Sequence, residues 1–221
     1  MSRGLFITFE GSEGCGKSTQ VMRLAARLKE RDVDFILTRE PGGTPIGEKI
    51  RELLQFAPEG FAMHPETELL LFEASRAQLV REVIQPALAR GTLVLSDRFY
   101  DSTTVYQGMA RRLQPEVVAS LNAFAVGDCR PDVTFVLDVD METARTRMLR
   151  RVRPVGGLDR MEQEPMEFYQ RIGAAYRALA EHEERVHLID GVQPPEEIEK
   201  AIWELLLAKF PAPFARSESA K

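Results

Sequence analysis

The sequence predicts an α/β fold of three layers, with a five-stranded parallel sheet covered by helices on both faces. Short apolar or β-branched runs alternate with longer helical stretches along the chain, which is the pattern of a parallel sheet wrapped by helices. A glycine-rich segment follows the first apolar run and opens the first helical stretch. The length of 221 residues and the hydrophobic share of 44% suit one such domain with a substantial core.

Each apolar run marks one strand, and each helical pattern between them marks a covering helix. Strands are expected at 5–9, 35–38, 93–96, 134–137 and 186–189. Helices are expected over 17–31, 45–56, 66–90, 101–111, 115–127, 141–150, 164–183 and 195–208. We expect one domain over residues 1–210, followed by a flexible tail over 211–221 that is small, polar and proline-bearing.

The expected helix 66–90 contains four consecutive apolar residues, Leu69 to Phe72. Four in succession cover more than one helical face, so this turn should be buried on several sides. Core packing is the preferred interpretation for Leu70 and Leu71. Alternatively, a ligand or a partner subunit buries part of this helix surface.

Composition narrows the classes of partner. The net charge is −5 and there is no long basic tract, so we expect no nucleic-acid partner. No apolar stretch approaches the roughly 18 residues of a membrane span, so no membrane partner is expected. The two cysteines, Cys15 and Cys129, form no disulfide framework, which favours a cytoplasmic location.

The strongest motif is the segment from Gly11 to Ser18, which fits G-x-x-x-x-G-K-[ST]. Glycines let successive backbone N–H groups surround a phosphate, and the following helix N-terminus adds free donors. Lys17 is expected to reach the β- and γ-phosphates of a nucleoside triphosphate, and the Ser18 hydroxyl to bind Mg²⁺. The alternative is a glycine-rich turn without a ligand. The motif predicts a fold of the P-loop NTPase type, in which the nucleotide contacts come from Gly11, Ser12, Glu13, Gly14, Cys15, Gly16, Lys17, Ser18 and Thr19.

Charged residues follow two further strands, where ligands gather in doubly wound sheets. Asp97 can hold Mg²⁺ together with Ser18, and Arg98 can clamp a phosphate. A helix-capping aspartate beside a solvated arginine is the alternative. Arg39 precedes a Pro-Gly-Gly turn and can bind a second phosphate group, although a surface arginine paired with Glu40 is also credible.

The segment from about 150 to 160 is rich in arginine and contains two adjacent glycines. We favour a lid that closes over transferring phosphates, with a solvated basic turn as the alternative. The chain lacks the Asn/Thr-Lys-x-Asp signature of GTP switches and the His-Arg-Asp loop of protein kinases. Arginines at several strand ends suit a kinase whose small acceptor itself carries a phosphate.

Taken together, these motifs resemble those of the bacterial thymidylate kinase family. The resemblance covers residues 6 to about 190, with the motifs in order and at family spacing. Its most specific part is the phosphate loop together with the Arg-Glu-Pro-Gly-Gly-Thr element. The matching segments are 9–20, 38–44, 70–78, 97–103, 106–108 and 158–162.

The resemblance implies roles for individual residues toward dTMP. Phe72 would stack on thymine, Arg76 would bind its exocyclic oxygen and Thr103 would meet its imide edge. Tyr106 would favour deoxyribose, with Gln107 nearby, and Glu13 would contact the 3′-hydroxyl. Phe72 and Arg76 are four residues apart and so share one helical face. By the same resemblance, Arg39 and Arg98 would bind the acceptor phosphate. ATP and Mg²⁺ would be bound by Lys17, Ser18 and Asp97. Phosphoryl transfer would be catalysed by Lys17, Arg98, Arg151 and Arg153.

The phosphate loop carries no arginine between Ser12 and Cys15, which resembles the family version whose lid supplies the cations. The lid over 151–157 is longer than the common form, so the position of the essential arginine stays open. The family also forms homodimers through helices that include the Phe72 helix.

The sequence thus predicts ATP-dependent phosphorylation of dTMP to dTDP in dTTP biosynthesis. A kinase for another nucleoside monophosphate is the nearest alternative, and a regulatory or transport P-loop ATPase is a more distant one.

Overall fold

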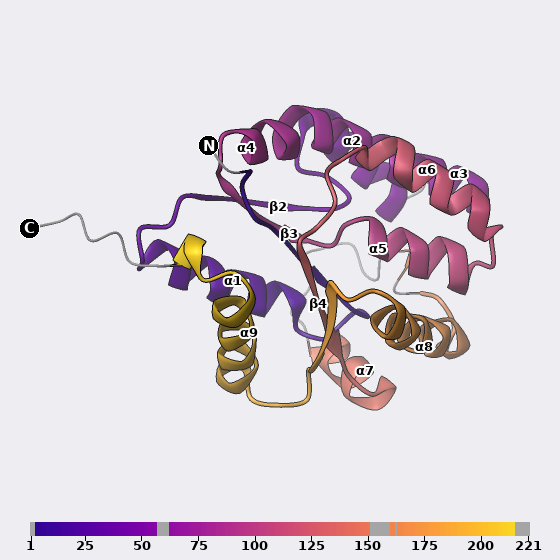
Figure 1. The fold of residues 1–221 in the computed structure, drawn as a ribbon. Helices are drawn as coiled ribbons and strands as arrows, with labels where there is room; N and C mark the ends of the chain where they lie inside the picture. Colours follow the sequence, from indigo (N-terminus) through magenta and orange to yellow (C-terminus); the bar gives the residue numbers. More distant parts are fainter. Residues whose placement is uncertain (1–2, 57–61, 151–159, 162, 215–221) are drawn as a thin grey trace, which may run out of the picture.

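A single parallel sheet organises the protein, as seen in a computed structural model that describes residues 3–56, 62–150, 160–161 and 163–214 (Figure 1). The strand order is β2-β3-β1-β4-β5, and all four pairings are parallel. The strands are β1 (Phe6–Glu10), β2 (Phe35–Arg39), β3 (Leu93–Asp97), β4 (Val133–Asp138) and β5 (Val186–Asp190). The five predicted strands are confirmed, each to within one residue at either end.

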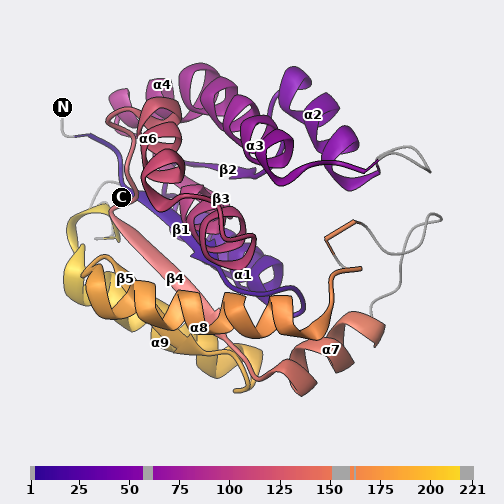
Figure 2. The ribbon, with the colours of Figure 1, turned by 90° about the vertical axis from the view of Figure 1, so that its right-hand side faces the viewer.

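Alternating side chains of the sheet contribute to apolar cores on its two faces. Ile7 and Phe9 of β1 face the layer of α1 (Lys17–Lys29) and α9 (Pro195–Lys209). Phe6 of the same strand faces the opposite layer. That layer includes α4 (Gln85–Ala89), α6 (Pro115–Val126) and α8 (Met166–His182). Figure 1 shows the sheet between the two layers, and in Figure 2 α6 and α8 lie in front of it. Successive side chains of each strand point to opposite faces of the sheet, and helices cover both apolar faces. The result is the three-layer fold.

The predicted helix 66–90 is divided into three parts. It consists of α3 (Pro65–Leu79), a π-helical turn η1 (Val80–Ile84) and α4. Pro86 follows the π-turn, within the first turn of α4. A proline has no N–H and its ring crowds the carbonyl four residues back, and the wider turn accommodates both effects. A helical pattern alone does not reveal such a change of pitch.

A second π-turn interrupts the helix predicted over 101–111, which is α5 (Tyr100–Thr103) followed by η2 (Thr104–Ala110). The remaining helices are α2 (Pro45–Gln55), which packs against α3, and α7 (Met141–Arg150). Among the described helices, none has both the length and the apolar character needed to cross a membrane.

One expectation about burial requires correction. Leu70 is not a core residue: it is 55% exposed, and Leu71 is half-buried. The apolar surface of residues 69–72 is wider than the area that the neighbouring elements cover. In the tail predicted from residue 211, residues 212–214 form the 3₁₀ turn η3, and Phe214 is buried against Trp203 with ring centroids 5.1 Å apart.

Candidate active site

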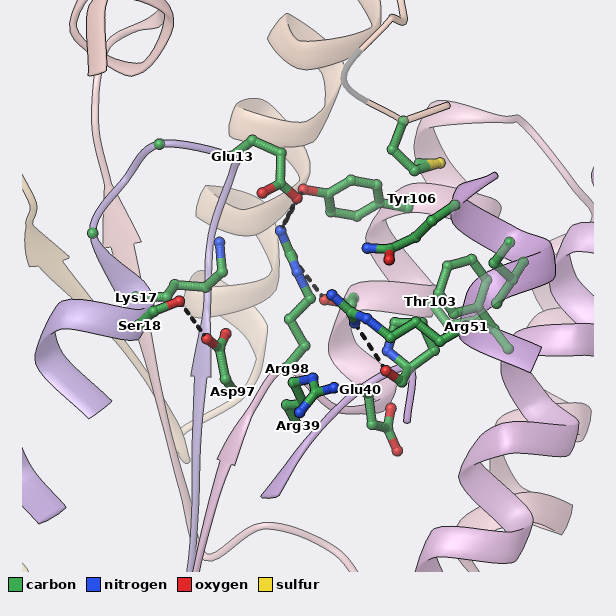
Figure 3. Close-up of a pocket in the computed structure, with 18 of the residues that line it drawn as sticks. Glu13, Lys17, Ser18, Arg39, Glu40, Arg51, Asp97, Arg98, Thr103 and Tyr106 are labelled. Carbon is green, nitrogen blue, oxygen red and sulfur yellow. Dashed lines mark hydrogen bonds and ion pairs between the residues drawn. The ribbon is translucent and has the colours of Figure 1, made fainter. Parts of the chain in front are cut away.

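A cavity of about 1090 Å³ opens at the carboxyl ends of β1, β2 and β3 (Figure 3). The loop after β1 lies on one side of it, and α3 and η2 lie on the other. Arg39 and Asp97 are the last residues of β2 and β3, and the two are register partners in the sheet. The parallel order of the strands therefore gathers the predicted phosphate-binding groups at one edge of the sheet.

The loop 11–16 ends at Gly16, which precedes the first turn of α1 with φ of 101°. This left-handed conformation favours glycine and points the chain into the helix. The Lys17 ammonium donates to the backbone carbonyls of Gly11 (3.0 Å) and Ser12 (2.8 Å). Lys17 and its neighbours Glu13, Gly14, Gly16, Ser18 and Thr19 line the cavity, whereas Cys15 within the loop is fully buried and does not line it.

Ser18 and Asp97 lie side by side at this end of the cavity, where the Ser18 hydroxyl donates to Asp97 Oδ2 at 2.7 Å (Figure 3). Hydroxyl and carboxylate oxygens are ligands that Mg²⁺ accepts, and the ion usually takes only one or two carboxylates beside phosphate and water. The described residues contain no group of three or more carboxylate, histidine or cysteine ligands. The donor set therefore fits a magnesium ion carried on a nucleotide better than a resident protein-bound metal.

Arg98 crosses the centre of the cavity from the end of β3. Its guanidinium donates to the Tyr106 hydroxyl at 3.1 Å, to Ser102 Oγ at 3.0 Å and to the Glu13 carboxylate. Its backbone has φ of 71°, an uncommon conformation for a residue with a side chain. Three residues predicted to surround the acceptor, Glu13, Arg98 and Tyr106, are thus in direct contact.

Glu10 holds the segment that carries Arg98, although sequence reasoning did not assign it a role. Its buried carboxylate accepts from the Phe99 backbone N–H (2.7 Å), Ser102 Oγ (2.6 Å) and the Tyr176 hydroxyl (2.7 Å). Burial raises the pKa of Glu10 above its usual value, and the Arg98 charge opposes part of this rise. Its place just before the phosphate loop was the only signal in the sequence.

Arg39 lines the cavity as predicted for a phosphate-binding residue, and its ion-pair partner is not Glu40, the partner in the alternative interpretation. Its guanidinium pairs with Glu48 of α2 at 2.9 Å. Glu40 is 5% exposed and turns inward, where Arg76 Nε and Nη2 donate to its Oε2 at 2.9 and 2.6 Å. The side chain of Arg39 is half exposed, so a phosphate can compete with Glu48 for it.

On the opposite side of the cavity lie Phe72, Thr103, Tyr106 and Gln107. Arg76, one turn beyond Phe72 on α3, lies behind them and is 1% exposed. Besides Glu40, it donates from Nη1 to Glu73, Thr103 and Asn122. Arg76 therefore supports the wall of the cavity and is not among the residues that line it. Its predicted hydrogen bond to a base stays a prediction.

The cavity also holds cations to which the sequence analysis gave no individual role. Arg51 of α2 lines it and donates to the Pro41 carbonyl at 2.9 Å (Figure 3). Arg147 and Arg150 of α7 line the side near the phosphate loop. Helix α2 begins shortly after β2 ends, at the edge of the sheet where ligands bind, so its side chains can be expected to reach the cavity. This position in the sequence was a usable signal for Arg51. The predicted lid arginines Arg151 and Arg153 lie outside the described residues.

Comparison with known proteins points to one family. A family model of thymidylate kinase matches residues 9–202. The chain is 50% identical to the thymidylate kinase of Pseudomonas putida (strain W619) over 203 residues, which cover 91% of this chain and 96% of the relative. It is 47% identical to that of Thermomicrobium roseum over 199 residues, 90% of this chain and 92% of the relative.

A solved structure agrees with these sequence relatives. The crystal structure of thymidylate kinase from Ehrlichia chaffeensis superposes with a TM-score of 0.73 at 33% identity, covering 92% of this chain and 99% of the other. The resemblance first seen in the motifs therefore extends over nearly the whole fold, including the phosphate loop and the strand ends that form the cavity. The chain belongs to the thymidylate kinase family.

Proposed function

We propose that this protein transfers the γ-phosphoryl group of ATP to dTMP and produces dTDP for dTTP biosynthesis. The observation that carries the proposal is one cavity that joins a phosphate loop to strand-end arginines and to the aromatic ring of Phe72. Such a cavity can hold a phosphate donor and a phosphate-bearing acceptor end to end. Family membership supports the assignment of the donor as ATP and the acceptor as dTMP.

The donor half is built on the loop 11–16 and the N-terminus of α1. Backbone N–H groups there attract the phosphates, and Lys17 would leave the Gly11 and Ser12 carbonyls to meet the β- and γ-phosphates. Ser18 and Asp97 would hold Mg²⁺. The ion neutralises charge that develops on the donor oxygens.

The acceptor half is built on β2, β3 and η2. Arg39 and Arg98 would bind the acceptor phosphate, and Glu13 would contact the 3′-hydroxyl. Tyr106 would lie against the sugar, and its hydroxyl is already fixed by Arg98 at 3.1 Å. Phe72 would stack on the base, with Thr103, Gln107 and the buried Arg76 at its polar edges.

Transfer would be in line: an oxygen of the acceptor phosphate attacks the γ-phosphorus, the bond from that phosphorus to the β,γ-bridging oxygen breaks, and ADP leaves. Arginines then stabilise the charge of the transition state, and no strong side-chain base is required. Arg98 lies between the two halves of the cavity. Arg151 and Arg153 are proposed from the sequence to add positive charge from the lid.

The proposal is tested by comparing turnover of ATP with dTMP, dUMP, UMP, CMP and AMP. We expect dTMP to give the highest kcat/KM, and Lys17→Ala to lower turnover by about a thousandfold without a change in melting temperature. Preference for another monophosphate would overturn the base assignment. Full ATP hydrolysis without any acceptor would favour the P-loop ATPase alternative.

We also propose that the protein is a homodimer in the cytoplasm. Leu70 on α3 and Phe124 on α6 are 55% and 80% exposed, which supports an interface over these helices. Cys15 and Cys129 are both buried free thiols, which supports a reducing compartment.

A further inference from the structure

A buried carboxylate touches the wall of the base pocket without lining the cavity itself. Glu68 lies on α3, one turn before Phe72, and its residue is fully buried. Its Oε1 accepts from Gln107 Nε2 at 2.6 Å and from Arg111 Nε at 3.2 Å. Its Oε2 accepts from Arg111 Nη2 at 3.0 Å and pairs with Arg160. Both oxygens are therefore held by directed donors.

The charges around Glu68 keep it ionised. Burial alone raises the pKa of a carboxyl group, but the hydrogen bonds from Arg111 and the charge of Arg160 outweigh it. The pKa of Glu68 consequently lies below its usual value. An ionised carboxylate has no hydrogen to donate, so it can act only as an acceptor.

This polarity fixes the orientation of the neighbouring amide. Only the NH₂ group of Gln107 can face an acceptor, so the amide cannot turn its carbonyl oxygen toward Glu68 without leaving two acceptors in contact. Gln107 lines the cavity. The end of the amide that lies away from Glu68 is therefore the carbonyl oxygen, which accepts and does not donate.

The second polar group at this edge has no fixed polarity. The Thr103 hydroxyl accepts from Arg76 Nη1 at 3.0 Å. A hydroxyl can still donate or accept toward a ligand, so it fits either kind of base edge. Of these two groups that line the cavity, Gln107 is therefore the one with a fixed hydrogen-bond polarity, which it adds to that of the buried Arg76, a group that can only donate.

We propose that Glu68 is a positioning residue that locks the Gln107 amide and makes the pocket select pyrimidines with an N–H at ring position 3. Thymine has that N–H, whereas cytosine has a bare acceptor nitrogen that would meet the Gln107 oxygen. A mismatch that leaves buried polar groups unpaired lowers affinity strongly. The inference rests on the proposed function, because it concerns the base of the acceptor nucleotide.

The test compares Glu68→Gln with a matched control. Glu164 pairs with Nη1 of the same Arg111 at 2.6 Å, so Glu164→Gln also removes one charge from Arg111. The described contacts of Glu164 do not include Gln107. Values of kcat and KM for dTMP and dCMP are measured for the wild type and both variants, together with melting temperatures.

We expect Glu68→Gln to lower the ratio of kcat/KM for dTMP over dCMP by about tenfold, which is the effect of about one hydrogen bond. The loss should arise from a higher KM for dTMP, with kcat within about twofold of the wild type. Glu164→Gln should retain the wild-type ratio. Glu68→Asp keeps the negative charge and should therefore retain most of the wild-type ratio. An unchanged ratio in Glu68→Gln, or an equal loss in Glu164→Gln, would overturn the inference.

Removing a buried charge partner of two arginines can prevent folding, so Gln107→Met provides a second route. This variant leaves Glu68 with Arg111 and Arg160 and must also lower the dTMP preference by about tenfold. An unchanged preference in Gln107→Met would overturn the inference as well. A wild type without dTMP turnover would instead refute the proposed function, so the two failures are distinguishable.

Discussion

At the scale of single residues, the phosphate loop was the most predictable part of the site and the inward contacts were the least. The loop's role follows from a contiguous motif whose glycines and lysine act within eight residues. The contacts of Glu10 and Glu40 depend on partners far along the chain, Tyr176 and Arg76. A residue type alone does not indicate whether a carboxylate after a strand faces a ligand or a buried arginine.

Glu40 gives the stability of the protein a specific dependence on pH. Burial raises its pKa from 4.5 to about 7, while Arg76 opposes this rise and Glu73 adds to it. Between about pH 4.5 and 7 the folded protein holds a proton on Glu40 that the unfolded chain has released. The contribution of Glu40 to the free energy of unfolding therefore falls as the pH rises through this window.

Glu40→Gln cannot ionise, so it isolates this effect. Relative to the wild type, its free energy of unfolding should increase by up to about 3 kcal/mol between pH 4.5 and 7. Urea unfolding of both proteins at several pH values measures the difference. A difference that stays constant with pH would contradict the raised pKa.

At the scale of elements, the strands were predictable because buried apolar runs bounded by turns have few other interpretations. The helices were predictable in position but not in pitch, because the sequence pattern does not distinguish an α-turn from the π-turns η1 and η2. The second of these holds Tyr106 and Gln107. The local backbone that presents these two site residues was therefore not predicted, although both residues were.

The start of α2 depends on a side-chain cap that can be tested. Thr44 Oγ1 accepts from the Gly47 backbone N–H at 3.0 Å, and Pro45 occupies the first helical position. Thr44→Ala should lower the free energy of unfolding by about 1 kcal/mol, whereas Thr44→Ser should retain most of it. Chemical denaturation measures both. Equal stability of the alanine variant and the wild type would show that the hydroxyl does not cap the helix.

At the scale of the whole molecule, the site exists because parallel strands end at one edge of the sheet. Phe72 of α3 and Lys17 of α1 come from opposite layers and meet only across that edge. The strand-end motifs predicted that Lys17 lies at this edge, whereas the place of Phe72 there was implied by the family resemblance. The cation Arg147 was missed because its helix α7 reaches the cavity through a packing angle that no local pattern specifies.

The outer surface of the α3 and α6 layer provides the last prediction. Val117, Leu121 and Phe124 recur at helical spacing on α6, and Val117 and Phe124 are well exposed. Leu70 lies on α3, which packs against α6 (Figures 1 and 2). An exposed apolar surface of this kind is typical of an interface between subunits. In a two-fold dimer a charge introduced there would be buried together with the same charge of the other subunit, and this repulsion would prevent association.

The wild type should therefore have a solution mass of about 50 kDa, twice the 25.0 kDa of one chain, by light scattering after size-exclusion chromatography. Phe124→Glu should shift this mass toward that of one chain. Val192→Glu replaces an exposed apolar residue after β5, away from these helices, and should leave the mass unchanged. A monomeric wild type, or a dimer that persists in Phe124→Glu, would contradict an interface over α6. Loss of the dimer in both variants would point to a general effect of added charge and would also count against that interface.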